Sequence, residues 1–266
     1  SYFSYNMCLD TEWYSEWVAK TMARVCRETG IDGIRLDEYG HRGYVCESPH
    51  HQHIFAEPGH NAWLQALSRN CRQVRKAIDE VRPGLVLTTE FPGHDCMSAA
   101  LDGAIVYDLR RINALRPAPI NLFRFYFPSC RTFEIDRPPT PDAPAFMLWN
   151  ATATFSPGPA YTDDVLAMLR RHAALFDSPD MTPLVPTLRR NVYANRFRHG
   201  EETAWTILNG VGHTVQGPML AIEPRPGFEV VDLLSGKELT VVDGAVHLFL
   251  RRSECRVIAC RPKPAP

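Results

Sequence analysis

Acidic side chains follow two successive apolar stretches of this 266-residue chain, and paired carboxylates are suited to acid–base and nucleophilic chemistry. The first stretch, 33–36, leads directly into Asp37 and Glu38, and the second, 85–89, leads into Glu90. One carboxylic acid can protonate a leaving oxygen while an ionised carboxylate traps the carbon from which that oxygen departs. Cleavage of a glycosidic bond uses this division of roles.

Each acid is expected at the end of a β-strand that follows an amphipathic helix. Apolar residues recur at three- and four-residue spacing over 12–29 and again over 63–81, and a glycine or a Pro-Gly pair ends each helix. Alternating helices and strands form parallel sheets with right-handed crossovers, so both strands point the same way. Asp37 and Glu90 should therefore emerge at one edge, which in a (β/α) barrel carries the active site.

The segment Gly33-Ile34-Arg35-Leu36-Asp37 is similar to the fourth-strand motif Gly-Phe-Arg-x-Asp of the α-amylase superfamily. More loosely, the chain looks like the barrels of α-galactosidases and related retaining glycosidases. The resemblance implies a glycoside hydrolase-like barrel in which Asp37 is the nucleophile, Arg35 its charge partner and Glu90 the acid/base. The His-Asp pair that amylases carry after their seventh strand is missing from the corresponding region, which favours a divergent or uncharacterised family.

A retaining double displacement requires an ionised Asp37 and a protonated Glu90, and it uses no cofactor. Arg35 lies two residues before Asp37 on the same strand face and favours the ionised carboxylate, whereas Glu90 follows an apolar strand, a drier setting that favours the acid. Adjacent strand residues point to opposite faces, so Asp37 and Glu38 cannot both face the pocket. A strand phase shifted by one residue would give the site to Glu38.

Further side chains are candidates to contact a sugar. The connection after the first acidic pair contains a tyrosine and several histidines, a composition that suits a polar lid over the pocket. Another strand-end acid follows the apolar run 103–106, and two aromatic residues near the rim could stack on a sugar ring, one of them in a strand expected at 123–128. Trp13 and Trp17, by contrast, are expected to pack in the core. The substrate-binding candidates are Arg35, Glu38, Tyr39, His50, His53, Asp108, Tyr126 and Trp149.

Two other functions remain open. A barrel that has lost catalysis and only binds carbohydrate predicts that Asp37→Asn leaves function intact. A metal-assisted hydrolase built on the histidine-rich loop predicts stoichiometric metal, because imidazoles and carboxylates suit zinc. The loop shows no helical His-x-x-x-His or comparable frame, so we predict no metal site there.

The helical pattern changes near residue 183 to short alternating strands separated by Asn-Gly, Ser-Gly and Asp-Gly turns. We therefore expect the C-terminal part of a (β/α) TIM-type barrel over 1–182, which is the catalytic part, an antiparallel β-sandwich over 183–261 and a tail over 262–266. About 180 residues hold roughly five βα units rather than eight. The barrel is thus expected to be incomplete at its N-terminus, with a missing N-terminal portion of the same protein as its partner.

The composition fits a soluble globular protein, and a neutral carbohydrate substrate makes no demand on its charge. Hydrophobic residues make up 45% of the chain and charged residues 22%, and the formal net charge of -1 argues against nucleic acid as a partner. The absence of an eighteen-residue apolar run argues against a membrane span. The eight cysteines show no CxxC pair, so we expect buried free thiols, which favour a reducing, cytoplasmic compartment.

Overall fold

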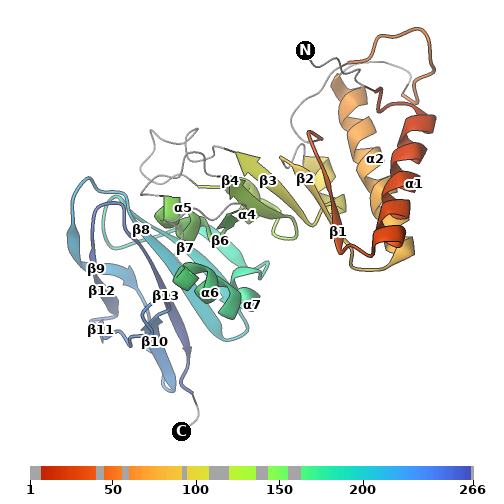
Figure 1. The fold of residues 1–266 in the computed structure, drawn as a ribbon. Coiled ribbons are helices and arrows are strands. Elements are labelled where there is room, and N and C mark those ends of the chain that lie inside the picture. Colours follow the sequence, from red (N-terminus) through yellow and green to blue (C-terminus); the bar gives the residue numbers. More distant parts are fainter. Residues whose placement is uncertain are drawn as a thin grey trace. The chain divides into compact units, whose positions relative to one another are not determined.

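The computed structural model describes residues 7–39, 45–55, 60–91, 95–107, 120–135, 143–154 and 163–264 (Figure 1). The chain divides into two compact units. Unit 1 comprises Ser1–Val106 with Ser129–Arg131, and unit 2 comprises Tyr107–Pro128 with Thr132–Pro266.

Unit 1 alternates helices and strands, as the sequence predicts. Its first helix has the predicted bounds because both of its ends are capped. Thr11 Oγ1 accepts a hydrogen bond from the backbone N–H of Tyr14 at 3.3 Å, and Gly30 adopts the left-handed conformation with φ 69°. The elements are α1 (Glu12–Thr29), β1 (Gly33–Leu36), α2 (His60–Val81), β2 (Val86–Glu90), the 3-10 helix η1 (Asp95–Ala100) and β3 (Gly103–Tyr107).

Helices α1 and α2 lie side by side (Figure 1) and bury apolar residues of both. The prediction that Trp13 and Trp17 pack in the core is wrong. Trp13 is 64% exposed and Trp17 is 49% exposed, and their rings stack on each other with centroids 6.2 Å apart. Smaller side chains provide the buried surface of α1 instead. The buried apolar residues of the two helices include Val18, Ala19, Ala23 and Cys26 of α1 and Leu67, Cys71, Val74 and Ile78 of α2.

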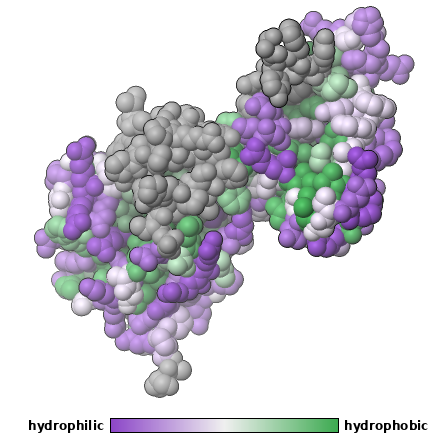
Figure 2. All heavy atoms as spheres, in the orientation of Figure 1, coloured by the Kyte–Doolittle hydropathy of each residue, from purple (hydrophilic) through white to green (hydrophobic). Residues whose placement is uncertain are grey.

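The three strands of unit 1 run parallel, which confirms the orientation expected from the alternating pattern. In β1 and β2, Gly33 lies opposite Val86 and Leu36 lies opposite Thr89. The backbones approach closely at the first of these pairs, because a Cβ atom on Gly33 would lie 2.5 Å from the carbonyl oxygen of Val86. Not every apolar side chain is buried. Hydrophobic residues, coloured green, reach the surface that Figure 2 shows, and Val86 of β2 is 45% exposed. Among the described strands β1 pairs only with β2, so this sheet is open at β1.

The first half of unit 2 consists of short helices and two short parallel strands, with Phe133 of one opposite Ala153 of the other. The strand predicted at 123–128 is wrong, because Asn121 starts a helix there. Its side-chain oxygen accepts a hydrogen bond from the backbone N–H of Arg124 at 3.3 Å. The elements are α4 (Leu122–Tyr126), β4 (Arg131–Ile135), α5 (Ala143–Asn150), β5 (Ala153–Thr154), α6 (Asp163–Arg171) and α7 (Ala173–Phe176).

The second half of unit 2 contains two antiparallel sheets. One has the strand order β10-β13-β8-β7-β6 and the other the order β11-β12-β9. Asp243 and Gly244 both have positive φ, 49° and 73°, and form the predicted turn between β11 and β12. The strands are β6 (Met181–Val185), β7 (Val192–His199), β8 (Glu202–Asn209), β9 (Val215–Ala221), β10 (Phe228–Asp232), β11 (Val241–Val242), β12 (Ala245–Leu250) and β13 (Cys255–Pro262).

The larger sheet is covered on both faces. Ile207 and Ile258 of this sheet share one core with Met219 and Val246 of the smaller sheet. The other face carries a second core in which α5 and α7 pack against β7, β8 and β13. Its members include Phe146, Trp149, Phe176, Phe197, Ala204 and Val257. In this second core, helices of unit 2 pack against its larger sheet, so helices and strands belong to one compact unit and the division between the units comes after Val106. Helices give way to antiparallel strands only near residue 183, where the sequence pattern changes.

All eight cysteines are unpaired. Five of them are buried as predicted, whereas Cys8 and Cys46 are half-buried and Cys96 is exposed. None of the described helices is both long enough and apolar enough to cross a lipid bilayer.

Candidate active site at the carboxyl edge of the parallel strands

The candidate carboxylates follow the last paired residues of two neighbouring parallel strands. Leu36 and Thr89 form the last pair of β1 and β2, and Asp37 and Glu90 are the next residues of the two chains. The side-chain hydroxyl of Thr89 donates to the carbonyl oxygen of Leu36 at 3.0 Å, which closes the end of this ladder. The parallel register therefore brings the backbones of the two acids to the same edge of the sheet.

Glu90 is buried, and its carboxylate binds the turn that follows β1. Only 9% of Glu90 is exposed, and its Oε2 accepts a hydrogen bond from the backbone N–H of Glu38 at 3.1 Å. Glu38 has φ 59°, a left-handed conformation that is uncommon outside glycine and that turns the chain away from the strand direction. The sequence reasoning considered only the side chain of Glu38, and this backbone contact was missed.

Asp37 is exposed and pairs with Arg35. One guanidinium nitrogen of Arg35 forms an ion pair with Asp37 Oδ1, and the side chains are 34% and 61% exposed, respectively. Water screens a pair this exposed, so its contribution to stability is about 0–1 kcal/mol. Its chemical effect is to set a positive charge beside one carboxylate, while Glu90 lies buried at the end of the next strand.

Tyr39 is half-buried and contacts helix α2. Its hydroxyl donates to Oδ1 of Asn70 on α2 at 3.0 Å, and burial raises the pKa of Tyr39 well above its ordinary value. The phenol therefore stays protonated and acts as a hydrogen-bond donor to the helix. This contact ties the turn after β1 to α2. The expected role of Tyr39 in sugar binding stays a prediction.

The two candidate histidines lie in different surroundings. His50 is exposed, and its backbone N–H donates to Oγ of Ser48 at 3.3 Å. His53 instead lies in a cluster with His51 of the same histidine-rich loop and with two cysteines, which the sequence had indicated only as buried thiols. Burial raises the pKa of one of these cysteines, Cys8, to about 11, and the neighbouring Cys46 thiol acts in the same direction.

The candidates from unit 2 divide between surface and core. Tyr126 lies on α4 and is 70% exposed. The expectation that Trp149 forms a rim subsite does not fit its position, because Trp149 is fully buried in the core between α5 and the larger sheet. Helix α5 is apolar almost throughout, which is typical of a buried helix. Asp108 lies outside the described residues.

No protein-family model and no curated protein matches this chain. Solved structures of glycoside hydrolases do. An α-amylase from Anoxybacillus is 13% identical, with a TM-score of 0.61 over 98% of this chain and 65% of the amylase chain. An α-amylase from Geobacillus thermoleovorans, solved with acarbose, is 14% identical, with a TM-score of 0.62 over 97% of this chain and 66% of that one. The α-galactosidase I from Mortierella vinacea is 8% identical, with a TM-score of 0.61 over 95% of this chain and 72% of that one.

These similarities show the fold, which is that of glycoside hydrolases of the α-amylase and α-galactosidase kinds. The resemblance read from the segment 33–37 is thereby confirmed at the level of the fold. The chain spans just under two thirds of the length of each of the two amylase chains.

Proposed function

We propose that this chain carries the catalytic carboxylates of a retaining glycoside hydrolase, with Asp37 as the nucleophile and Glu90 as the general acid/base. The observation that carries the proposal is the hydrogen bond from the N–H of Glu38 to the buried carboxylate of Glu90, which joins the ends of two parallel strands directly beside Asp37. The similarity in fold to amylases and α-galactosidases supports the substrate class, a carbohydrate with an O-glycosidic bond.

In the first step, the Asp37 carboxylate attacks the anomeric carbon while the glycosidic C–O bond breaks and Glu90 gives its proton to the departing oxygen. The product is a glycosyl ester on Asp37. In the second step, the Glu90 carboxylate takes a proton from water, the water oxygen attacks the anomeric carbon and the ester bond breaks. Two inversions restore the original configuration, and both carboxyl groups return to their starting states.

The surroundings of the two acids support this division of roles. The guanidinium of Arg35 stabilises the negative charge that Asp37 needs before it attacks. Glu90 lies at the end of a strand whose neighbour β3 is buried, with Ile105 opposite it. Fixing Glu90 through the backbone of the turn, rather than through a mobile side chain, favours a constant position for proton transfer.

We also propose the architecture that such an enzyme requires, namely a catalytic barrel portion over 1–182 and a β-sandwich over 183–261. The two antiparallel sheets with a shared core support the sandwich. An N-terminal portion of the same protein would complete the barrel. Support comes from β1, whose outer edge pairs with none of the described strands, since sheet edges in proteins are normally paired or covered.

Turnover of a panel of aryl α- and β-glycosides by the wild type, Asp37→Asn and Glu90→Gln tests the proposal. We expect both variants to lose at least about 100-fold in kcat/KM. Asp32→Asn is the matched control, because Asp32 lies just before β1, at the other end of the strand, has a 96% exposed side chain and pairs with Arg82. This control should retain full activity.

Added azide separates the two roles. In Glu90→Gln, azide needs no general base and should restore turnover to give a glycosyl azide with retained configuration. In Asp37→Gly, azide fills the space of the missing carboxylate and should give the inverted product. The assignment fails if azide produces the opposite stereochemistry, or if both variants keep wild-type rates.

Sugar binding without turnover by the wild type would favour a carbohydrate-binding barrel that has lost catalysis.

A further inference from the structure

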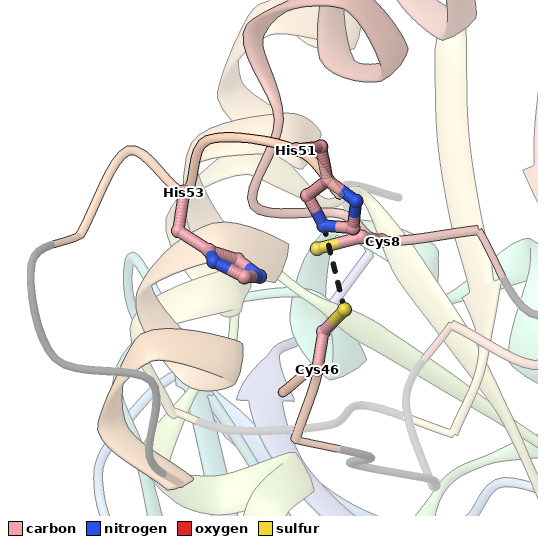
Figure 3. A group of neighbouring side chains, drawn as sticks. All are labelled: Cys8, Cys46, His51 and His53. Carbon is pink, nitrogen blue, oxygen red and sulfur yellow. Dashed lines mark hydrogen bonds between the residues drawn. The ribbon is translucent and has the colours of Figure 1, made fainter. Parts of the chain in front are cut away.

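Four side chains from two distant segments of the chain meet in unit 1 (Figure 3). Cys8 precedes α1, whereas Cys46, His51 and His53 belong to the connection between β1 and α2. One ligand atom of each lies within 4.8 Å of those of the other three. We propose that these residues form a structural zinc site with two sulfur and two nitrogen ligands.

The donor set and its dimensions match zinc. Two thiolates with two imidazoles make a tetrahedral set typical of zinc, whereas calcium and magnesium prefer oxygen ligands. Usual Zn–S and Zn–N bond lengths imply ligand atoms roughly 3.3–3.8 Å apart in a tetrahedron. Nε2 of His51 already lies 3.4 Å from Sγ of Cys46, and the rings of His51 and His53 meet edge to face with centroids 4.7 Å apart. Contractions of up to about 1.5 Å would complete the tetrahedron.

One ring nitrogen in the cluster is placed to bind a cation. Nε2 of His53 is buried and has no hydrogen-bond partner among the residues that the structure describes. A buried polar atom left in this way is costly, and coordination to a cation would satisfy it.

The site would serve structure rather than catalysis. Catalytic zinc sites keep one position open for water, whereas four protein ligands close the coordination sphere. The cluster joins the segment before α1 to the connection after β1, and Asp10 reinforces this junction. Its carbonyl oxygen accepts from the N–H of Ile54 at 3.0 Å, and its Oδ2 accepts from the N–H of Phe55 at 3.3 Å. Zinc would thus anchor the loop that follows the candidate nucleophile Asp37.

Metal content of the full chain tests the proposal, and it does so independently of any glycosidase activity. Wild-type protein exposed to zinc and then exchanged into metal-free buffer should retain one zinc per chain by elemental analysis. Cobalt in place of zinc should produce a thiolate-to-cobalt charge-transfer band. Cys46→Ser and His53→Asn should each lose most of the zinc, whereas the matched controls Cys96→Ser and His50→Asn, which change exposed residues, should retain it.

Alkylation of the wild type provides a second measurement in case the ligand variants fail to fold. Cys8 and Cys46 should be protected from iodoacetamide until a strong chelator is added, and chelation should lower the temperature of thermal unfolding by several degrees. The proposal is overturned by a wild type that retains no metal, by one that retains copper or iron in preference to zinc, or by a Cys8–Cys46 disulfide in the intact protein. Equal reactivity of both thiols with and without chelator would also overturn it.

Discussion

Replacement of Glu90 by alanine should loosen the turn after β1 by a predictable amount. Glu90 is 9% exposed, and its side chain accepts a hydrogen bond from the N–H of Glu38. Removing one partner of a buried hydrogen bond costs about 1–3 kcal/mol. The bond also holds Glu38 at φ 59°, a conformation that is uncommon outside glycine, so the effect should be concentrated in this turn. We therefore expect Glu90→Ala to lose about 2 kcal/mol, and Glu90→Gln, which keeps an acceptor oxygen, at most about 1 kcal/mol.

Amide hydrogen exchange measures this loss of stability at the backbone amide of Glu38. A loss of about 2 kcal/mol corresponds to roughly 30-fold faster exchange of the Glu38 amide in Glu90→Ala, and about 1 kcal/mol to roughly fivefold in Glu90→Gln. The amide of Val86 is the internal control, because it donates to the carbonyl oxygen of Asp32 at 2.9 Å, at the opposite end of the same strand pair. If Glu38 exchanges at the wild-type rate in both variants while Val86 is unchanged, the hydrogen bond does not hold the turn.

Two further predictions concern stability. Gly33→Ala places a Cβ atom 2.5 Å from the carbonyl oxygen of Val86 and should lower the free energy of unfolding by about 1–3 kcal/mol in urea. Gly30→Ala, with open space around its Cβ but φ 69°, should cost about 1 kcal/mol, and an equal loss in both would contradict the packing explanation. Burial lowers the pKa of His172 below its ordinary value of 6.5, and the nearby Glu202 opposes this shift. The stability that the neutral ring provides is therefore complete above pH 6.5. It declines as the pH falls from 6.5 toward the pKa of His172 in the folded state. His172→Gln should flatten this decline in thermal unfolding measured from pH 7.5 to 5, and an unchanged slope would exclude His172 as its source.

Residues close together in the sequence determined much of unit 1. The apolar spacing over 12–29 and the caps at Thr11 and Gly30 are local features, and α1 has the bounds that they predict. The alternation of helices with short apolar strands also determined the parallel direction of β1 and β2. The ion pair between Arg35 and Asp37 belongs to the same class, because Asp37 follows Arg35 by only two positions.

Other outcomes depended on which surfaces pack together, and periodicity does not report that. An apolar stripe on a helix can face the core or stay open. Trp13 and Trp17 are exposed because smaller residues of α1 face α2, whereas Trp149 is buried because α5 lies against the larger sheet. The turn after β1 likewise follows a left-handed conformation at Glu38, which strand alternation does not predict.

The meeting of distant residues was decided by the tertiary structure alone. Cys8 is separated from Cys46 by a helix and a strand, so the sequence shows no ligand spacing that would unite them, and only the packing of that connection against the start of α1 brings them together. The same holds for the bond between Glu38 and Glu90. Local patterns determine elements and their order because they act over a few residues, whereas a site is made by contacts between elements whose positions only the packed chain defines.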